Sequence, residues 1–260
     1  MSSMNNDVKH ISIFGIKILN ITMPEALERI SNAVCGHTPS RMYFVNADCL
    51  NKVFNDQMYG EVLLQADAVF GDGIGVRIAS IAGGTPIVDN VNGTDMFPLL
   101  CELCVREGFS IYFLGGNPGV AERMSGRLCD TYRGLRVAGL HDGYFDKELE
   151  SSAIIENINT SGADILLVAF GAPLQEKWIH EHASRIRCSV VMGVGGLFNF
   201  YSGDKPRAPF LMRKLGVEWV HRLLCDPRRL WQRYIIGNPR FIWRVFCKRI
   251  TGTLQHSPGK

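Results

Sequence analysis

The chain has 260 residues, of which 46% are hydrophobic and 20% charged, and its net charge is +3. This is the composition of an ordinary globular protein, which excludes disordered and fibrous chains, and the length allows one sizeable core with a small appendage. The polar start, Met1 to Asp7, lacks the order of a signal peptide, and no window reaches the roughly 18 uncharged apolar residues of a membrane-spanning helix. We therefore expect a cytoplasmic protein that is soluble or peripheral to a membrane.

From about residue 8 to residue 200, short apolar runs alternate with longer segments of helical spacing. The runs predict strands at Met42–Val45, Ala68–Phe70, Ser110–Leu114, Leu135–Ala138, Ile165–Phe170 and Val190–Val194. The intervening segments predict helices at residues 23–35, 47–57, 73–82, 94–107, 118–132, 147–159 and 173–186. This alternation predicts an α/β fold with a mostly parallel sheet and helices on both faces. The continuous apolar strands fit a sheet that is covered on both sides.

In such a sheet, ligands bind beyond the carboxyl ends of the strands, and this rule selects the polar and glycine-rich turns of the chain. A helix start is predicted at Asn117, which would be the cap, with Pro118 as the first helical residue. Pro173 predicts a second helix start in the same way. Glycine pairs before such starts leave N–H groups free for a diphosphate, although the same glycines also make tight turns. The selected turns are Asn46 and Asp48, Gly71 to Gly75, Gly115 to Pro118, His141 to Tyr144, Gly171 to Glu176, and Gly195 with Gly196.

Common motifs of cofactor and metal sites are missing from the sequence. The dinucleotide fingerprint G-x-G-x-x-G is not met, because Gly71 to Gly75 lacks the third spacing and Gly115 to Gly119 has the wrong order. There is no Walker A lysine motif and no Asp-x-Asp pair for Mg²⁺ or Mn²⁺. Cys101 and Cys104 form a C-x-x-C without a second pair, so we expect buried, reduced thiols. We predict no metal and no cofactor.

The C-terminal segment, residues 205–260, carries thirteen Lys and Arg against two acidic residues, whereas the first 204 residues carry 15 basic and 23 acidic ones. Trp and Phe interleave with Arg residues that recur every four to seven positions, and we expect Pro239 to interrupt the last helical segment. This pattern indicates an interfacial helix on anionic lipid. We therefore place a domain boundary between residues 204 and 205. The alternatives are a solvated basic face and a nucleic-acid surface, and the segment matches no nucleic-acid module.

Taken together and in order, the motifs resemble the bacterial WecG/TagA/CpsF glycosyltransferase family. The resemblance spans about residues 40 to 234, and the ordered series is more specific than any one motif. The matching pieces are Val45-Asn46-Ala47, Ala66-Asp67, Phe70 to Val76, Gly93-Thr94-Asp95, Phe113 to Gly116, Asp142 to Phe145, Gly171 to Glu176, Gly193 to Gly196, Arg207-Ala208-Pro209, Leu215 to Trp219, Arg222-Leu223, Pro227-Arg228-Arg229 and Arg233-Tyr234.

The resemblance implies an inverting transfer of a hexosyl unit from a UDP-sugar to a polyprenyl-diphosphate-linked saccharide, in bacterial surface or exopolysaccharide synthesis. It implies a Rossmann-like catalytic body and a C-terminal helical appendage that meets the inner face of the cell membrane. The family's proposed catalytic base falls on Asp72, where a carboxylate would take the proton of the acceptor hydroxyl. Flanking glycines let such a carboxylate approach a substrate closely. The alternative for Asp72 is a helix cap.

The resemblance also assigns candidate residues around this base. Asn46 and Gln175 are assigned to the catalytic group together with Asp72, and Gln175 would hydrogen-bond the sugar donor. Glu176 is expected to be a structural ion-pair partner. Alternatively, the Asn46 side chain only satisfies the hydrogen bonds of its own turn, and Tyr144 is a half-buried packing residue. The arginines of the set suit bidentate binding of a diphosphate. The substrate-binding candidates are Gly115, Gly116, Tyr144, Gly195, Gly196, Asn199, Arg222, Arg229 and Arg233.

Two positions depart from the family pattern. Relatives often have Arg where this chain has Asn90, and Asp where it has Asn199. The family uses UDP-N-acetylmannosamine, its uronic acid or UDP-glucose, and the missing Arg disfavours the uronic acid. Two other functions stay open: an NAD- or nucleotide-dependent soluble enzyme of the same fold class, and a non-catalytic module that binds membranes or nucleic acid.

Overall fold

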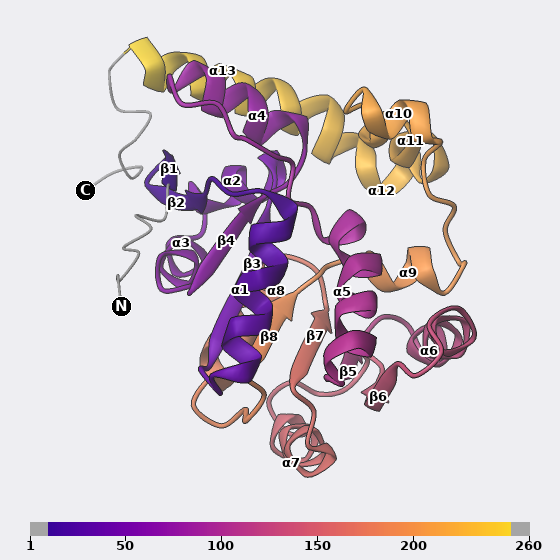
Figure 1. Ribbon diagram of the computed structural model, residues 1–260. Helices are drawn as coiled ribbons and strands as arrows, with labels where there is room; N and C mark the ends of the chain where they lie inside the picture. Colours follow the sequence, from indigo (N-terminus) through magenta and orange to yellow (C-terminus); the bar gives the residue numbers. More distant parts are fainter. Residues whose placement is uncertain (1–9, 251–260) are drawn as a thin grey trace.

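An eight-stranded sheet forms the centre of the computed structural model, which describes residues 10–250 (Figure 1). Its strands lie in the order β1-β2-β4-β3-β8-β7-β5-β6, and every pairing except β1 with β2 is parallel. The predicted mostly parallel sheet is therefore confirmed. The strands are β1 (His10–Ile13), β2 (Ile16–Leu19), β3 (Ser40–Val45), β4 (Ala68–Gly71), β5 (Ser110–Gly115), β6 (Arg136–His141), β7 (Ile165–Ala169) and β8 (Val190–Gly193).

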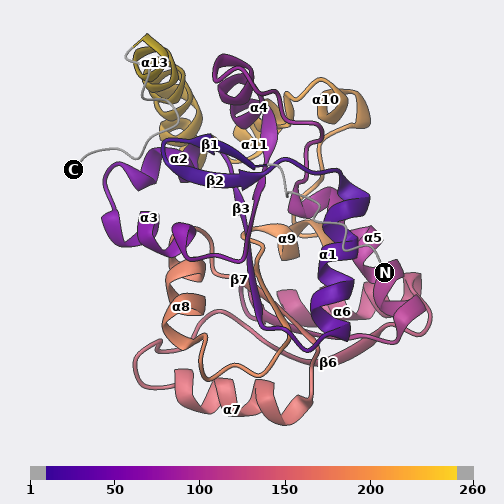
Figure 2. The same cartoon turned by 60° about the vertical axis from the view of Figure 1, so that its left-hand side comes forward.

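Helices cover both faces of the sheet, as predicted (Figure 2). Strand side chains alternate between the two faces: in β7, Ile165 and Leu167 pack on one side, and Leu166 and Val168 on the other. Continuous apolar strands are explained by this burial on both sides. The first face is covered by α1 (Met23–Cys35), α5 (Gly93–Glu107), α6 (Val120–Thr131) and α9 (Leu197–Tyr201), and the second by α2 (Ala47–Val53), α3 (Gln57–Leu64), α7 (Ser151–Ser161) and α8 (Leu174–His182).

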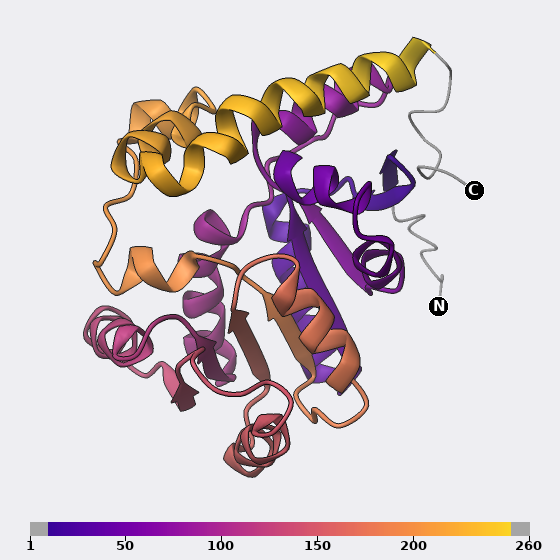
Figure 3. The same cartoon turned by 180° about the vertical axis from the view of Figure 1, so that it is seen from behind.

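The remaining helices lie beyond the carboxyl ends of the strands (Figures 1 and 3). Pro239 lies inside the last of them, so the expected interruption at this residue is wrong. A proline is tolerated in the first turn of a helix, and the turn before α13 is itself π-helical. These elements are α4 (Gly73–Ala82), α10 (Phe210–Lys214), α11 (Glu218–Cys225), α12 (Pro227–Trp231), the π-helical turn η1 (Gln232–Ile236) and α13 (Gly237–Ile250).

Three local features differ from the sequence prediction. The hairpin of β1 and β2 was not predicted; Phe14 and Gly15, with φ of 52° and 83°, form its two-residue loop. The predicted helix 47–57 ends at Val53, and a separate helix, α3, which the Asp56 side chain caps, was not predicted. Asn117 does not cap α6, which begins at Val120 after Gly119. Within residues 10–250, no helix has the length and apolar run that crossing a bilayer requires.

Candidate active site

A cavity of about 1250 Å³ lies between the carboxyl ends of the strands and the C-terminal helices. Common small-molecule sites measure ~300–1,000 Å³, so this cavity has room for more than one ligand. Its walls come from the turns after β3, β4, β7 and β8, and from α11, α12 and η1. It brings together most of the predicted site residues: Asn46, Asp72, Tyr144, Gln175, Gly195, Gly196, Asn199, Arg222, Arg229 and Arg233.

Asp72 lies between the end of β4 and the start of α4. Its backbone N–H donates to the Val45 carbonyl at 2.8 Å, and the next N–H, of Gly73, donates to Asn90 Oδ1 at 2.7 Å. Asp72 occupies the N-cap position of α4, as the helix-cap alternative expects, but its side chain makes no capping hydrogen bond there. The backbone on both sides of Asp72 is held by hydrogen bonds while its carboxylate stays available at the cavity wall.

Asp72 and Arg222 influence each other's ionisation across the cavity. Burial raises the pKa of the Asp72 carboxyl, and the positive charges of Arg222 and Arg233 oppose that rise. Burial would lower the pKa of Arg222, but the negative charges of Glu218 and Asp72 outweigh it, so its pKa is raised. A carboxylate with a raised pKa and a guanidinium that stays charged therefore line the same cavity.

Gln175 ties two turns of the cavity wall together. Its Oε1 accepts from the N–H groups of Gly171 at 3.1 Å and Gly195 at 2.9 Å, and its Nε2 donates to Glu176 Oε1 at 2.8 Å. Glu176, expected to pair with a cation, thus hydrogen-bonds to this amide instead, and burial raises the pKa of Glu176 to about 7. The side chain of Gln175 is 3% exposed and orients the turns that follow β7 and β8.

Asn46, Tyr144 and Asn199 occupy different parts of the wall. Asn46 Oδ1 accepts from the N–H groups of Asp48 at 3.0 Å and Cys49 at 3.2 Å, so it caps α2 and satisfies its turn while lining the cavity. Tyr144 is 71% exposed, which contradicts the alternative of half-buried packing. Asn199 lies on α9, close to where the chain enters the C-terminal segment.

The glycine pair at the end of β5, Gly115 and Gly116, lies outside the cavity lining found in the described part of the chain. Gly116 donates its N–H to the Ala169 carbonyl at 3.2 Å, and a Cβ on Gly115 would lie 2.7 Å from the same oxygen. Gly115 has a φ of 131°, which only glycine adopts without strain. The prediction that these glycines leave free N–H groups is therefore wrong for Gly116. It is also wrong for Gly195, whose N–H donates to Gln175 Oε1. The close approach of β5 and β7 explains why glycines occupy positions 115 and 116.

Each of the three predicted arginines is held by a carboxylate. The Arg222 guanidinium also stacks over the Phe200 ring, 4.8 Å from its centroid. Arg233 belongs to the π-helical turn η1, a distortion that is frequent at functional sites. The pairs are Arg222 with Glu218 at 2.6 Å, Arg229 with Asp226 at 2.7 Å, and Arg233 with Asp48 at 3.5 Å.

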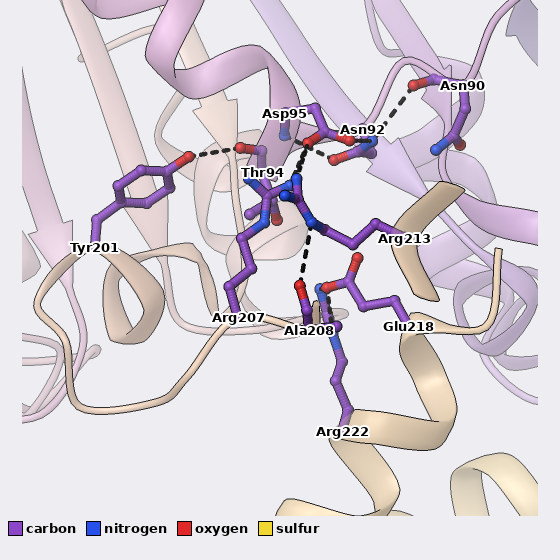
Figure 4. A network of polar contacts seen from close by, with 10 residues as sticks. All are labelled: Asn90, Asn92, Thr94, Asp95, Tyr201, Arg207, Ala208, Arg213, Glu218 and Arg222. Atoms are coloured by element: carbon purple, nitrogen blue, oxygen red, sulfur yellow. Dashed lines mark hydrogen bonds and ion pairs between the residues drawn. The ribbon is translucent and has the colours of Figure 1, made fainter. Parts of the chain in front are cut away.

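Figure 4 shows the contacts that fasten the C-terminal segment to the start of α5. Asp95, in the first turn of α5, pairs with Arg207 and, at 3.5 Å, with Arg213. Asn92 donates to Asp95 Oδ2 at 2.6 Å. Burial would raise the pKa of Asp95, but the hydrogen bonds from Asn92 and Arg207 hold it below its usual range. The charge of Asp95 thus helps to hold the segment that carries Arg222.

Sequence reasoning missed several of these residues. The Gly-Thr-Asp motif contained Asp95 but gave no hint that it would bind the C-terminal segment. Asn51 had no signal at all: its Nδ2 donates to the Gly237 carbonyl at 2.8 Å, and its Oδ1 accepts from Arg244 at 2.8 Å, which fixes α13 on α2. Among residues 10–250, no three His, Cys, Asp or Glu side chains gather as they would around a metal ion.

The chain is similar to known glycosyltransferases over nearly its whole length. The profile of the glycosyl transferase WecG/TagA/CpsF family matches residues 11–255. Relatives in Staphylococcus aureus strains NCTC 8325 / PS 47, COL and MRSA252 are named N-acetylglucosaminyldiphosphoundecaprenol N-acetyl-beta-D-mannosaminyltransferase. Each is 29% identical over 237 residues, which cover 90% of this chain and 91% of the relative.

Proposed function

The chain belongs to the glycosyl transferase WecG/TagA/CpsF family, and we propose that it transfers a hexosyl unit from a UDP-sugar to a polyprenyl-diphosphate-linked saccharide. This reaction would serve bacterial surface or exopolysaccharide synthesis. The observation that carries the proposal is the position of Asp72, whose side chain makes no capping hydrogen bond and lines, together with Arg222, a cavity large enough for two ligands. The names of the relatives, which specify an undecaprenyl-linked acceptor, support the same reaction.

Asp72 is proposed as the catalytic base. Its carboxylate takes the proton of an acceptor hydroxyl while that oxygen attacks the anomeric carbon of the donor. The bond between this carbon and the diphosphate breaks on the opposite face, UDP leaves with the electron pair, and the configuration inverts. The raised pKa of Asp72 makes it a stronger base at neutral pH, and Arg222 and Arg233 help to keep it ionised.

The three cavity arginines are proposed to hold the leaving diphosphate. A diphosphate presents oxygens to a guanidinium as a carboxylate does, and it carries more charge, so it would displace the carboxylates that now hold these side chains. The existing ion pairs would keep the guanidinium groups oriented before the donor arrives. We therefore propose that the charge on the leaving group is neutralised without a metal ion.

The donor sugar is proposed to be N-acetylmannosamine, with its uronic acid and glucose as the other candidates. The relatives are named as N-acetylmannosaminyltransferases. Asn90 favours a neutral donor sugar, because its Oδ1 accepts from the Gly73 N–H and its side chain brings no positive charge to the turn that carries Asp72. Asn46 and Tyr144, which line the cavity, would contact the sugar or the nucleotide, and Gln175 would hold the turns around them.

The C-terminal helices are proposed to bring this site to the inner face of the cell membrane. Residues 205–260 carry thirteen Lys and Arg, and Trp231, Trp243 and Phe246 are between 46% and 66% exposed. Cations beside exposed aromatic rings suit a surface of anionic lipid, where each cation contributes about 1 kcal/mol. A lipid-linked acceptor would be presented at the same surface.

A donor panel tests the proposed function. The protein is mixed with an undecaprenyl-diphosphate-linked N-acetylglucosamine and, in turn, with UDP-N-acetylmannosamine, its uronic acid, UDP-glucose and NADH, with and without a chelator. We expect UDP release and a lengthened lipid-linked saccharide with N-acetylmannosamine, in chelator as well as without it. Binding of NADH without transfer from any UDP-sugar would favour a nucleotide-dependent enzyme of another kind and contradict the proposal.

A further inference from the structure

Helix α4, which belongs to the catalytic body and begins directly after Asp72, presents an apolar stripe to solvent. Ile74, Ile78 and Ile81 are 37%, 40% and 54% exposed. They lie at positions i, i+4 and i+7, which place them on one face of the helix. The opposite face packs into the core through Val76 and Ala79, both 0% exposed. An exposed stripe of three isoleucines beside a catalytic turn requires an explanation of its own.

This stripe is continuous with two C-terminal helices. Helices α4 and α13 lie side by side along one edge of the molecule, and α10 lies near their end (Figures 1 and 3). The contact with α13 is close, because a Cβ on Gly75 would lie 3.5 Å from the Phe241 ring. The turn after α10 reaches the stripe, since a Cβ on Gly216 would lie 3.4 Å from Ile74.

Both neighbouring helices also expose large apolar side chains. In α10, Phe210 and Leu211 are 70% and 65% exposed, and Leu215, directly after the helix, is 63% exposed. In α13, Phe241 and Val245 face the body, and the residues on the other side are between 40% and 70% exposed. Together with the α4 stripe, these side chains form a surface that we call the docking face: Ile74, Ile78, Ile81, Phe210, Leu211, Leu215, Ile242, Trp243, Phe246 and Ile250.

The charged residues of the three docking helices have one sign. Helices α4, α10 and α13 contain seven Lys and Arg and no Asp or Glu. Two of these cations contact the body, since Arg213 pairs with Asp95 and Arg244 bonds to Asn51. Asp89, in the loop after α4, accepts from the N–H of Met23, the first residue of α1. Apolar side chains among cations fit the surface of an anionic lipid bilayer.

We propose that α4, α10 and α13 form one lipid-docking face, so that the catalytic body itself, through Ile78 and Ile81, enters the surface of an anionic membrane. The inference rests on the proposed function for its biological setting, and it extends membrane contact from the C-terminal segment to the body. Asp72 precedes Ile81 by nine residues, which is about 14 Å at 1.5 Å per residue. Because a helix that docks through one side lies along the membrane surface, this is a lateral distance, and docking through α4 keeps the base close to the headgroups that carry the acceptor.

Vesicle sedimentation tests the docking face on the full-length chain. The double variant Ile78→Ser with Ile81→Ser is compared with Leu64→Ser with Leu149→Ser, which makes the same kind of change at exposed leucines on α3 and before α7. The vesicles contain phosphatidylglycerol and phosphatidylcholine. We expect the α4 variant to bind about tenfold more weakly than the wild type, equal to about 1.4 kcal/mol, and the control to bind as the wild type does.

Turnover on a water-soluble, short-chain acceptor separates docking from chemistry. We expect the α4 variant to keep wild-type turnover on this acceptor and to lose turnover on acceptor embedded in vesicles. Equal vesicle binding by the α4 variant and the wild type would overturn the proposal, and so would loss of binding in the control pair. Self-association through α4, seen as a dimer in sedimentation that the α4 variant abolishes, would also overturn it. If the wild type transferred sugar to neither acceptor, the proposed function would be contradicted. The comparison of vesicle binding would still test the docking face.

Discussion

The substitution Glu176→Gln should stabilise the protein at alkaline pH and leave its stability nearly unchanged at acidic pH. Glu176 is fully buried, and its pKa is raised from 4.5 to about 7, chiefly because burial penalises the charged form. The folded state therefore binds a proton more tightly than the unfolded state does. The stabilising effect of this proton is complete below pH 4.5 and is lost as the pH rises through about 7.

The size of the effect follows from the shift. A displacement of one pKa unit corresponds to 1.36 kcal/mol, so a rise from 4.5 to about 7 is worth about 3 kcal/mol. Glutamine has the same shape, offers an oxygen to Gln175 Nε2 and cannot ionise. At pH 8 we expect Glu176→Gln to be about 3 kcal/mol more stable than the wild type, which is about 6 °C in melting temperature for a domain of this size.

The assay is thermal or urea unfolding of both proteins at pH 5 and pH 8. Glu28→Gln, on the exposed side of α1, is the matched control for the same chemical change. The reasoning predicts that the difference between Glu176→Gln and the wild type grows with pH. A variant that is less stable than the wild type at pH 8 would show that the Glu176 side chain is ionised and favourably held in the folded protein. An equal stability difference at both pH values would show that folding does not raise the pKa of Glu176, and it would also refute the reasoning.

Three further results are expected. Asp95→Asn removes the charge that holds Arg207 and Arg213, so limited proteolysis between residues 203 and 209 should be several times faster, and unchanged cleavage would contradict this role. Arg222→Lys keeps a positive charge but loses the planar fork, so initial rates should give a kcat/KM about tenfold lower. Burial raises the pKa of Asp72 and only its carboxylate accepts a proton, so kcat/KM should fall as the pH drops through a midpoint above that of an exposed aspartate. A pH–rate profile that stays flat there would exclude Asp72 as the base.

The fold was largely predictable because most strands are buried on both sides. A strand such as Ile165–Ala169 reads as an unbroken apolar run whatever its neighbours are. The β1–β2 hairpin was missed because its strands have only four residues each and sit at the edge of the sheet. The order of the strands had no local signal, since it depends on which strands meet in space.

The candidate site was predictable to the extent that it follows from the carboxyl edge of a parallel sheet. The turns that carry Asn46, Asp72, Gln175 and Gly195 meet at the cavity because they follow neighbouring strands. The contacts of Asp95 with Arg207 and of Asn51 with Arg244 join residues 112 and 193 positions apart, and no spacing rule reaches that far. The hydrogen bond from the Gly116 N–H to the Ala169 carbonyl was equally unpredictable, because it depends on β5 lying beside β7.

The most direct measurement is single-turnover transfer to a lipid-linked acceptor by Asp72→Asn, with donor affinity measured separately by calorimetry. Asp67→Asn is the matched control, since Asp67 precedes β4 as Asp72 follows it and pairs with Arg41 at 3.2 Å. We predict that Asp72→Asn slows transfer by at least about 100-fold while donor affinity stays within about threefold, and that Asp67→Asn transfers at the wild-type rate. Transfer by Asp72→Asn at a rate close to that of the wild type would contradict the assignment of the base.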